Sequence, residues 1–175
     1  ELTYQPRGRT IDGDNYFISH LAGKEENDPP VHIIGFSQDL DRRSETGRPR
    51  LAAHALVQEY LNRTESLWGL VTNGRILRLL RDSGLMRRQS YIEFDLQSMM
   101  EGEKFADFVI FYRLLHRSRF PKSGQSYEDC LLEKYHHLSV EQGGRVRDHL
   151  RDGVEQALKI FAHGFLKLSL INISE

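Results

Sequence analysis

Three aspartates close to a short apolar run are the residues of this chain best placed for metal-dependent phosphodiester chemistry. Such a site holds Mg²⁺ with carboxylates, and a nearby lysine polarises the attacking water or the phosphate. Asp39 and Asp41 follow the run 31–36 and Asp28 precedes it, but no lysine stands two residues after either aspartate. We therefore assign no metal site, and Asp28, Asp39 and Asp41 are candidate catalytic residues only in a divergent arrangement.

Arginines gather in three places along the chain. The planar guanidinium has five donors and suits bidentate contacts with phosphate better than the lysine ammonium does. On this basis we predict DNA-binding residues at Arg42, Arg43, Arg75, Arg78 and Arg81. The alternative is a solvated surface on which these arginines pair with acids. The clusters are Arg42, Arg43, Arg48 and Arg50; Arg75, Arg78, Arg81, Arg87 and Arg88; and Arg113, Arg117, Arg119 and Lys122.

The sequence context of the cysteine and of the paired histidines indicates structural rather than catalytic roles. Cys130 lies next to Leu131 and Leu132, which is typical of a small buried side chain rather than a nucleophile. His136 and His137 would point in different directions on a helix and have no third ligand at metal-binding spacing. The phosphate-binding loops and the nucleophile elbow that mark several enzyme classes are absent.

Bulk properties limit the class of protein. The chain has 175 residues, a net charge of −1 and one cysteine. This length suits one domain with an appended helical piece, and any anion binding must come from clustered charge. A single cysteine fits a reducing compartment, so we expect a cytoplasmic protein. No apolar run reaches the roughly 18 residues of a membrane helix, and the chain ends favour a fragment of a longer polypeptide.

The first hundred residues show strand patterns around one helix. We predict strands over 31–36 and 89–96, a helix over 51–63 and a hairpin over 68–81. Asn73-Gly74 at the centre of this hairpin predicts a type I′ turn, which needs positive φ at both central residues.

Apolar residues then change to helical spacing. We predict helices over 105–115, 127–138 and 146–161, with Gln142-Gly143-Gly144 interrupting the last two. The predicted fold is therefore α/β or α+β. A small mixed sheet occupies residues 1–100, and a mainly helical portion that packs on it occupies residues 101–175.

An ordered series of motifs resembles the N-terminal region of one enzyme family. That family comprises large bifunctional restriction–modification enzymes and related phage-defence proteins, which carry an adenine-specific DNA methyltransferase further along the chain. The strand that ends in Thr72-Asn73-Gly74 is also similar to the nuclease-like part of type I restriction subunits. The matching segments are 56–63, 67–75, 77–82, 91–96, 106–108, 116–120, 132–134 and 150–155.

The resemblance implies S-adenosylmethionine, magnesium and DNA for the whole enzyme, and only part of this transfers to the present chain. The methyltransferase signature Asn-Pro-Pro-Tyr is absent, so we expect no cofactor site here. The acid-x-lysine pair of the nuclease pattern is also missing after 31–36. By resemblance, the sheet is expected to be a degenerate restriction-endonuclease-like fold.

Three functions remain open from the sequence. The first is a non-catalytic accessory domain that contacts the DNA backbone or docks the methyltransferase domain of the same chain. The second is an active Mg²⁺-dependent endonuclease with a divergent acidic site. The third is a purely structural module between domains, which would carry a large exposed apolar patch.

Overall fold

The computed structural model describes residues 1–43, 50–82, 91–122 and 125–171, with side chains described as far as residue 166. The chain forms two compact units, Glu1–Leu131 and Leu132–Glu175, each described by itself below. The sequence placed the change from sheet to helical portion at residue 100, whereas the first unit runs on to Leu131.

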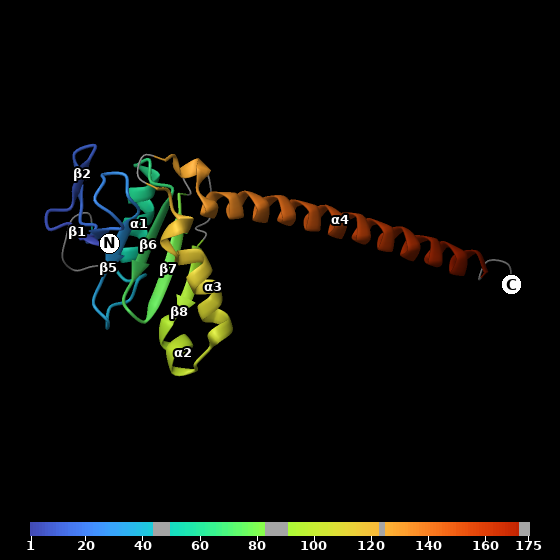
Figure 1. Ribbon diagram of the computed structural model, residues 1–175. Helices are drawn as coiled ribbons and strands as arrows, with labels where there is room; N and C mark the ends of the chain where they lie inside the picture. The colour runs from blue at the N-terminus through green and yellow to red at the C-terminus, as the bar shows by residue number, and fades with distance from the viewer. Residues whose placement is uncertain (44–49, 83–90, 123–124, 172–175) are drawn as a thin grey trace. The chain divides into compact units, whose positions relative to one another are not determined.

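A six-stranded mixed sheet forms the centre of the first unit, in the order β1-β4-β5-β6-β7-β8 (Figure 1). Only β5 and β6 run parallel, and α1 (Ala53–Asn62) connects them. A helical crossover is the usual way to join parallel neighbours. The strands are β1 (Thr3–Tyr4), β4 (His20–Leu21), β5 (Pro30–Ile33), β6 (Trp68–Thr72), β7 (Ile76–Arg81) and β8 (Tyr91–Asp95).

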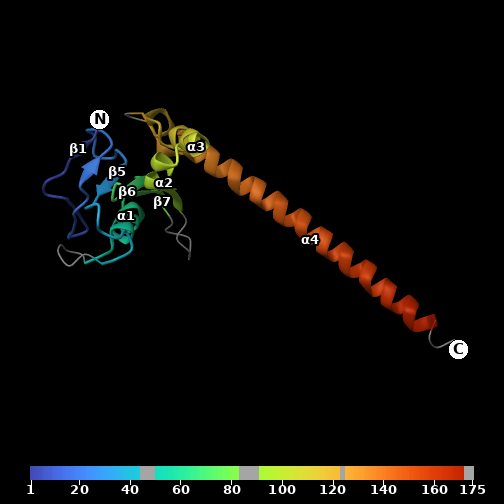
Figure 2. The ribbon, with the colours of Figure 1, turned by 90° about the horizontal axis from the view of Figure 1, so that it is seen from below.

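A second, two-stranded sheet and several short helices complete this unit. The small sheet pairs β2 (Arg9–Ile11) with β3 (Asp14–Tyr16). Figures 1 and 2 show α1 on one face of the large sheet and α3 on the other. The remaining helices are α2 (Leu96–Glu101), α3 (Phe105–Leu115) and the 3₁₀ turns η1 (Arg117–Arg119) and η2 (Tyr127–Asp129).

The main core lies between α1 and the sheet. Val57, Tyr60 and Leu61 on α1 are buried against Val71 and Leu80 of the central strands. Gly69 allows this close packing, because a Cβ there would lie 3.1 Å from Val57 Cγ1 and 3.0 Å from Pro30 Cγ.

The hairpin forms where the sequence predicts it, but its turn differs. Gly74 has a φ of +82°, whereas Asn73 is not among the described residues with positive φ, so the type I′ prediction at Asn73-Gly74 is wrong. Asn73 acts through its side chain instead: Oδ1 accepts hydrogen bonds from the backbone N–H groups of Arg75 (3.0 Å) and Ile76 (2.9 Å). An amide that bonds to nearby backbone donors is a common way to close a turn.

The second unit consists of the helix α4 (Leu131–Ile171) from Leu132 onward. The break that we predicted at Gln142-Gly143-Gly144 is wrong, because the helix continues through these residues. A Cβ at Gly143 or Gly144 would meet nothing within 4 Å, so neither glycine serves a close packing contact. Glycine lowers helix propensity by about 1 kcal/mol but does not forbid a helix.

The predicted fold class is confirmed. The N-terminal part holds a mixed sheet and a hairpin, and the C-terminal part is mainly helical with one long helix.

Candidate nucleic-acid interface

The segment 34–43, called the 34–43 loop below, is fastened along the end of the β6–β7 hairpin. Asn73 Nδ2 donates to the carbonyl of Gln38 at 2.8 Å. Ile34 N–H donates to the carbonyl of Thr72 at 3.0 Å, and the Arg75 guanidinium lies 5.6 Å from the centre of the Phe36 ring. The loop therefore has a defined position relative to the strands.

Arg78 on β7 provides the strongest attachment for this loop. Its Nη1 and Nη2 donate to the two carboxylate oxygens of Asp41 at 2.6 and 2.8 Å. Its Nε donates to Glu93 at 2.7 Å, directly across the β7–β8 ladder. The Arg78 side chain is only 8% exposed, whereas those of Asp41 and Glu93 are 60% and 40% exposed. A buried guanidinium is thus neutralised by two carboxylates that reach it from the surface.

Two aromatic rings complete the surroundings of Arg78. Its guanidinium lies 4.5 Å from the centre of the Tyr91 ring, and Nη1 lies 3.3 Å from Nδ1 of the buried His54. Burial, followed by the charge of Arg78, lowers the pKa of His54, so the imidazole is neutral at pH 7. The hydrogen bonds from Arg78 hold the pKa of Asp41 below its usual value.

His54 has one unusual feature. Because Arg78 can only donate, Nδ1 of the neutral ring is the acceptor and Nε2 carries the hydrogen. Within the part of the chain that the structure describes, this buried Nε2 has no hydrogen-bond partner. The ring instead lies edge-on to Tyr91, with ring centres 5.0 Å apart.

The arginines predicted to bind DNA fall into two groups. Arg42 and Arg43 directly follow Asp41 and are exposed, and Arg75 is exposed at the end of the hairpin. Arg78 is buried in the cluster just described, and Arg81 is half-buried, with Nη1 donating to the carbonyl of Asp82. The guanidinium of Arg78 is occupied by Asp41 and Glu93, so this residue supports the surface rather than forming it.

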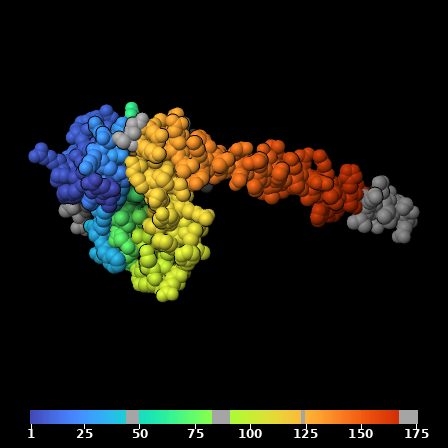
Figure 3. Space-filling view, viewed as in Figure 1, coloured from blue at the N-terminus to red at the C-terminus, as the bar shows by residue number. Residues whose placement is uncertain are grey.

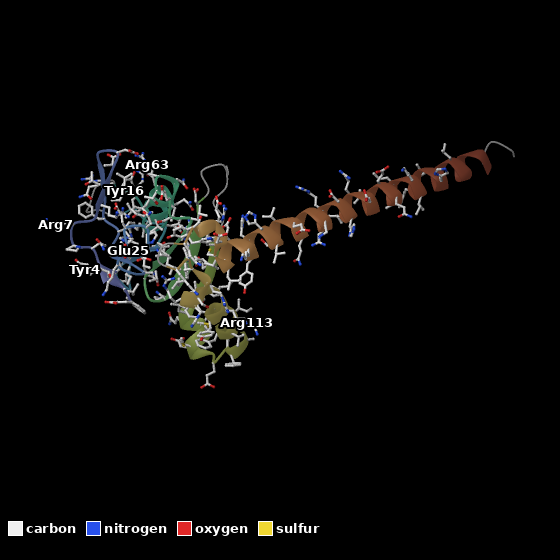
Figure 4. All side chains as sticks on the ribbon, turned by 45° about the horizontal axis from the view of Figure 1, so that its top comes forward. Tyr4, Arg7, Tyr16, Glu25, Arg63 and Arg113 are labelled. Carbon is white, nitrogen blue, oxygen red and sulfur yellow. The ribbon has the colours of Figure 1, made fainter. Side chains whose placement is uncertain are left out.

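The third basic cluster lies after the middle of α3. Figure 4 shows Arg113 at the outer edge of the first unit, and its side chain is exposed. Arg117 donates to the carbonyl of Pro121 at 2.6 Å, and Arg119 donates to that of Arg113 at 2.8 Å. Arg48, Arg87 and Arg88 of the predicted clusters lie outside the described residues.

The three candidate catalytic aspartates make separate structural hydrogen bonds. Asp28 is buried and accepts from the backbone N–H of Glu25 at 2.8 Å. Asp39 accepts from the backbone N–H of Asp41 at 2.8 Å, and Asp41 binds Arg78. Across the described ranges, no three His, Cys, Asp or Glu side chains form a group that could hold a metal ion.

Sequence reasoning missed the cluster around Arg78. Arg78 and Glu93 lie on adjacent antiparallel strands, so strand alternation and hairpin register could have paired them. Asp41 and His54 come from a loop and a helix that are distant in sequence, and no local pattern signals their approach.

Comparison with known proteins gives no match to a family model, to a curated protein or to a solved structure. Among the helices described, none is long and apolar enough to cross a membrane. The function is therefore inferred from the residues themselves and from the resemblance in the sequence.

Proposed function

We propose that this chain is a cytoplasmic accessory region of a DNA restriction–modification enzyme and that it contacts the DNA backbone. The observation that supports this function is the exposed pair Arg42 and Arg43 on a loop that Arg78 and Asn73 fasten to the sheet. The ordered sequence motifs supply the enzyme class, and the arginines supply the chemistry toward phosphate.

The fixed position of the 34–43 loop favours binding to the DNA backbone. Binding costs free energy whenever a mobile loop must be ordered, and a loop that is already held in place avoids part of that cost. The two hydrogen bonds from Arg78 to Asp41 end one residue before Arg42, so the backbone at the arginine pair is constrained. Arg75 contributes a third exposed guanidinium at the hairpin end that the same loop touches.

In this proposal, S-adenosylmethionine and magnesium, which the resemblance implies for the whole enzyme, bind outside the present chain. The described residues contain no three-ligand group for magnesium, and the sequence lacks the adenine methyltransferase signature. We therefore propose neither a cleavage step nor a methyl-transfer step in this chain.

Duplex DNA binding by an Arg42→Gln/Arg43→Gln double variant tests the proposal. If both arginines contact phosphate, affinity at low salt falls by about tenfold for every DNA sequence. The plot of log affinity against log salt also becomes shallower by about 0.9 for each phosphate that is no longer neutralised. Fluorescence anisotropy with labelled duplexes over a salt series measures both effects.

A matched control removes two cations from another part of the same unit. Arg7 and Lys24 are both exposed and lie outside the 34–43 loop in the sequence; Figure 4 shows Arg7 at the opposite edge of the unit from Arg113. The Arg7→Gln/Lys24→Gln variant changes net charge equally and should keep the wild-type salt slope. Equal slopes for the wild type and both variants would refute the DNA-contact role of Arg42 and Arg43.

One observation favours a second candidate function, docking to a neighbouring domain. Large apolar side chains of α4 from Leu138 to Leu166 are more than half exposed. Many exposed apolar residues on one helix are typical of a surface that another protein segment covers. Amide exchange along α4, with and without the rest of a longer enzyme, tests this role.

A further inference from the structure

The helix α3 carries a row of exposed aromatic rings. Phe108 and Tyr112 are 38% and 53% exposed, and Phe105 in the first turn is 74% exposed. The exposed His116 follows directly after the helix and continues the row. We call Phe105, Phe108, Tyr112 and His116 the aromatic row. In Figure 3 the atoms of α3 face the viewer on the surface of the first unit.

This row is not part of the hydrophobic core. No side chain of α3 is buried, although the helix is strongly apolar. Phe111 is the inner ring: it meets the buried Phe94 of β8 edge-on, with ring centres 5.3 Å apart. One side of α3 thus contacts the sheet, and the aromatic row remains on the surface.

Three rings of the row, Phe108, Tyr112 and His116, are neighbours along the helix. The centres of Phe108 and Tyr112 are 6.4 Å apart with an angle of 29° between planes. The centres of Tyr112 and His116 are 5.1 Å apart, and the Ser118 hydroxyl lies 2.9 Å from His116 Nδ1. Phe108 and Tyr112 therefore have similar ring orientations, whereas the plane of His116 is tilted by 50° from that of Tyr112. Exposed ring faces of this kind are surfaces on which flat ligands can stack.

Basic residues outnumber acidic ones in the stretch that contains the aromatic row. Between Lys104 and Lys122 the chain has one acid, Asp107, against five basic residues. Arg113 follows Tyr112 and is exposed, and Lys104 precedes Phe105. The basic residues of this stretch are Lys104, Arg113, Arg117, Arg119 and Lys122.

We propose that the aromatic row binds single-stranded nucleic acid, with unpaired bases stacked on Phe108 and Tyr112 and the phosphates near Arg113 and Lys104. Exposed aromatic side chains beside cationic ones are the combination that single-strand binding surfaces use. A duplex cannot use the rings in this way, because its bases are already stacked within the helix.

The charge argues for this occupant over an apolar helix from another protein. Covering the row with an apolar partner would desolvate the neighbouring Arg113 and Lys104 without supplying a counter-charge. A nucleic acid strand offers base faces to the rings and phosphates to the cations. The site is separate from Arg42 and Arg43, so it does not depend on the proposed duplex contact.

Anisotropy of the 175-residue chain with a labelled oligo(dT) of about 20 nucleotides tests this site. Phe108→Ala should weaken binding by about tenfold. Phe108→Leu should weaken it almost as much, because leucine keeps apolar area but has no ring face. Arg113→Gln should reduce the salt slope by about 0.7.

Ile110→Ala is the matched control. Ile110 is on the same helix and 53% exposed but is not aromatic, so this variant should bind oligo(dT) like the wild type. Thermal unfolding of all variants checks that the fold is kept. Binding of oligo(dT) by Phe108→Leu at wild-type strength, or no binding by the wild type at low salt, would overturn the proposal.

Two further outcomes separate the possible partners. Self-association of the chain that is lost in Phe108→Ala but kept in Phe108→Leu would identify the row as an apolar protein-docking surface and overturn the proposal. Duplex binding that is lost in Arg42→Gln/Arg43→Gln while oligo(dT) binding persists would support two separate sites.

Discussion

The residue that most changes the functional interpretation of this chain is Arg78. Its type and its place in an arginine-rich strand favoured a DNA contact. Arg78 and Arg81 are three residues apart on β7, however, and strand side chains alternate between faces, so the two project to opposite sides. Arg78 therefore lies on the face that carries α1, where His54, Asp41 and Glu93 surround it.

The two carboxylates around Arg78 should be energetically coupled. After Asp41→Asn or Glu93→Gln alone, the buried guanidinium keeps one counter-charge, and we expect a loss of about 1 kcal/mol in unfolding free energy. After both changes it has none, and a buried unpaired charge costs several kcal/mol. The loss in the double variant should exceed the sum of the single losses by at least about 1 kcal/mol, measured by urea unfolding.

The carboxylates around Arg63 provide the control for this cycle. Arg63 pairs with Asp14 and Glu59, but its own side chain is 37% exposed, so it remains solvated when both partners are removed. Figure 4 shows Arg63 close to Tyr16, in the same unit. Asp14→Asn and Glu59→Gln should be additive. Additive losses at Arg78 as well would show that its burial does not couple Asp41 to Glu93.

A partly buried histidine on β5, His32, should set part of the stability at acid pH. Burial, with a smaller effect of His20, lowers the pKa of His32 to about 4. The unfolded chain binds a proton at His32 near pH 6.5, whereas the folded chain does so only near pH 4. The contribution of His32 to the unfolding free energy is therefore fully present above pH 6.5 and decreases as the pH falls toward 4. The loss is about 1.4 kcal/mol per pH unit within this window.

His32→Asn isolates this contribution. His32 Nδ1 accepts from the Ser19 N–H at 3.3 Å, and the asparagine Oδ1 can take over that bond without titrating. Urea unfolding from pH 7 to pH 4 should show a shallower loss in the variant. Some loss remains, because His54 also has a lowered pKa. The same pH dependence in both proteins would contradict the assignment to His32.

At the level of elements, hydrophobic periodicity correctly predicted one helix and several strands of the first hundred residues and their order. The strand 31–36, the helix 51–63, the hairpin 68–81 and the strand 89–96 appear as β5, α1, β6–β7 and β8 with small changes at their ends. These patterns succeed because each element buries one face, and burial imposes the period of the element.

The turn and helix-breaking signals of Asn and Gly predicted the local structure less well than hydrophobic periodicity did. Asn73-Gly74 correctly marked the hairpin turn, but the Asn73 amide also reaches the carbonyl of Gln38, 35 residues earlier. That contact depends on where the 34–43 loop lies, which no local sequence rule specifies. Gly143-Gly144 suggested a break because glycine weakens helices, yet α4 continues through both glycines.

For the whole molecule, the sequence identified the change from sheet to helix but not the extent of the first unit. α2 and α3 are helical, so composition grouped them with the C-terminal half. In the structure α2 contacts β7 and β8, and Phe111 of α3 packs on Phe94, which makes both helices part of the sheet unit. Helical periodicity shows that a face is apolar but not which element covers it.

The second unit leads to a prediction about local stability. Isolated helices are marginal in water, and most helix stability in proteins comes from packing an apolar face. Large apolar residues of α4, including Val146, Leu150 and Phe161, are more than half exposed. In the monomeric chain, amides of α4 beyond Leu138 should therefore exchange at least about a hundredfold faster than those of β6 and β7, which open only with the core.

Hydrogen exchange followed by mass spectrometry at several protein concentrations measures this difference. If a neighbouring domain of a longer enzyme covers the apolar residues, the α4 amides become protected in that enzyme while those of β6 and β7 change little. Protection that rises with the concentration of the isolated chain would instead identify a second copy as the partner. Protection of α4 equal to that of β6 in the dilute monomer would contradict the prediction, because the helix would then be stable without a covered face.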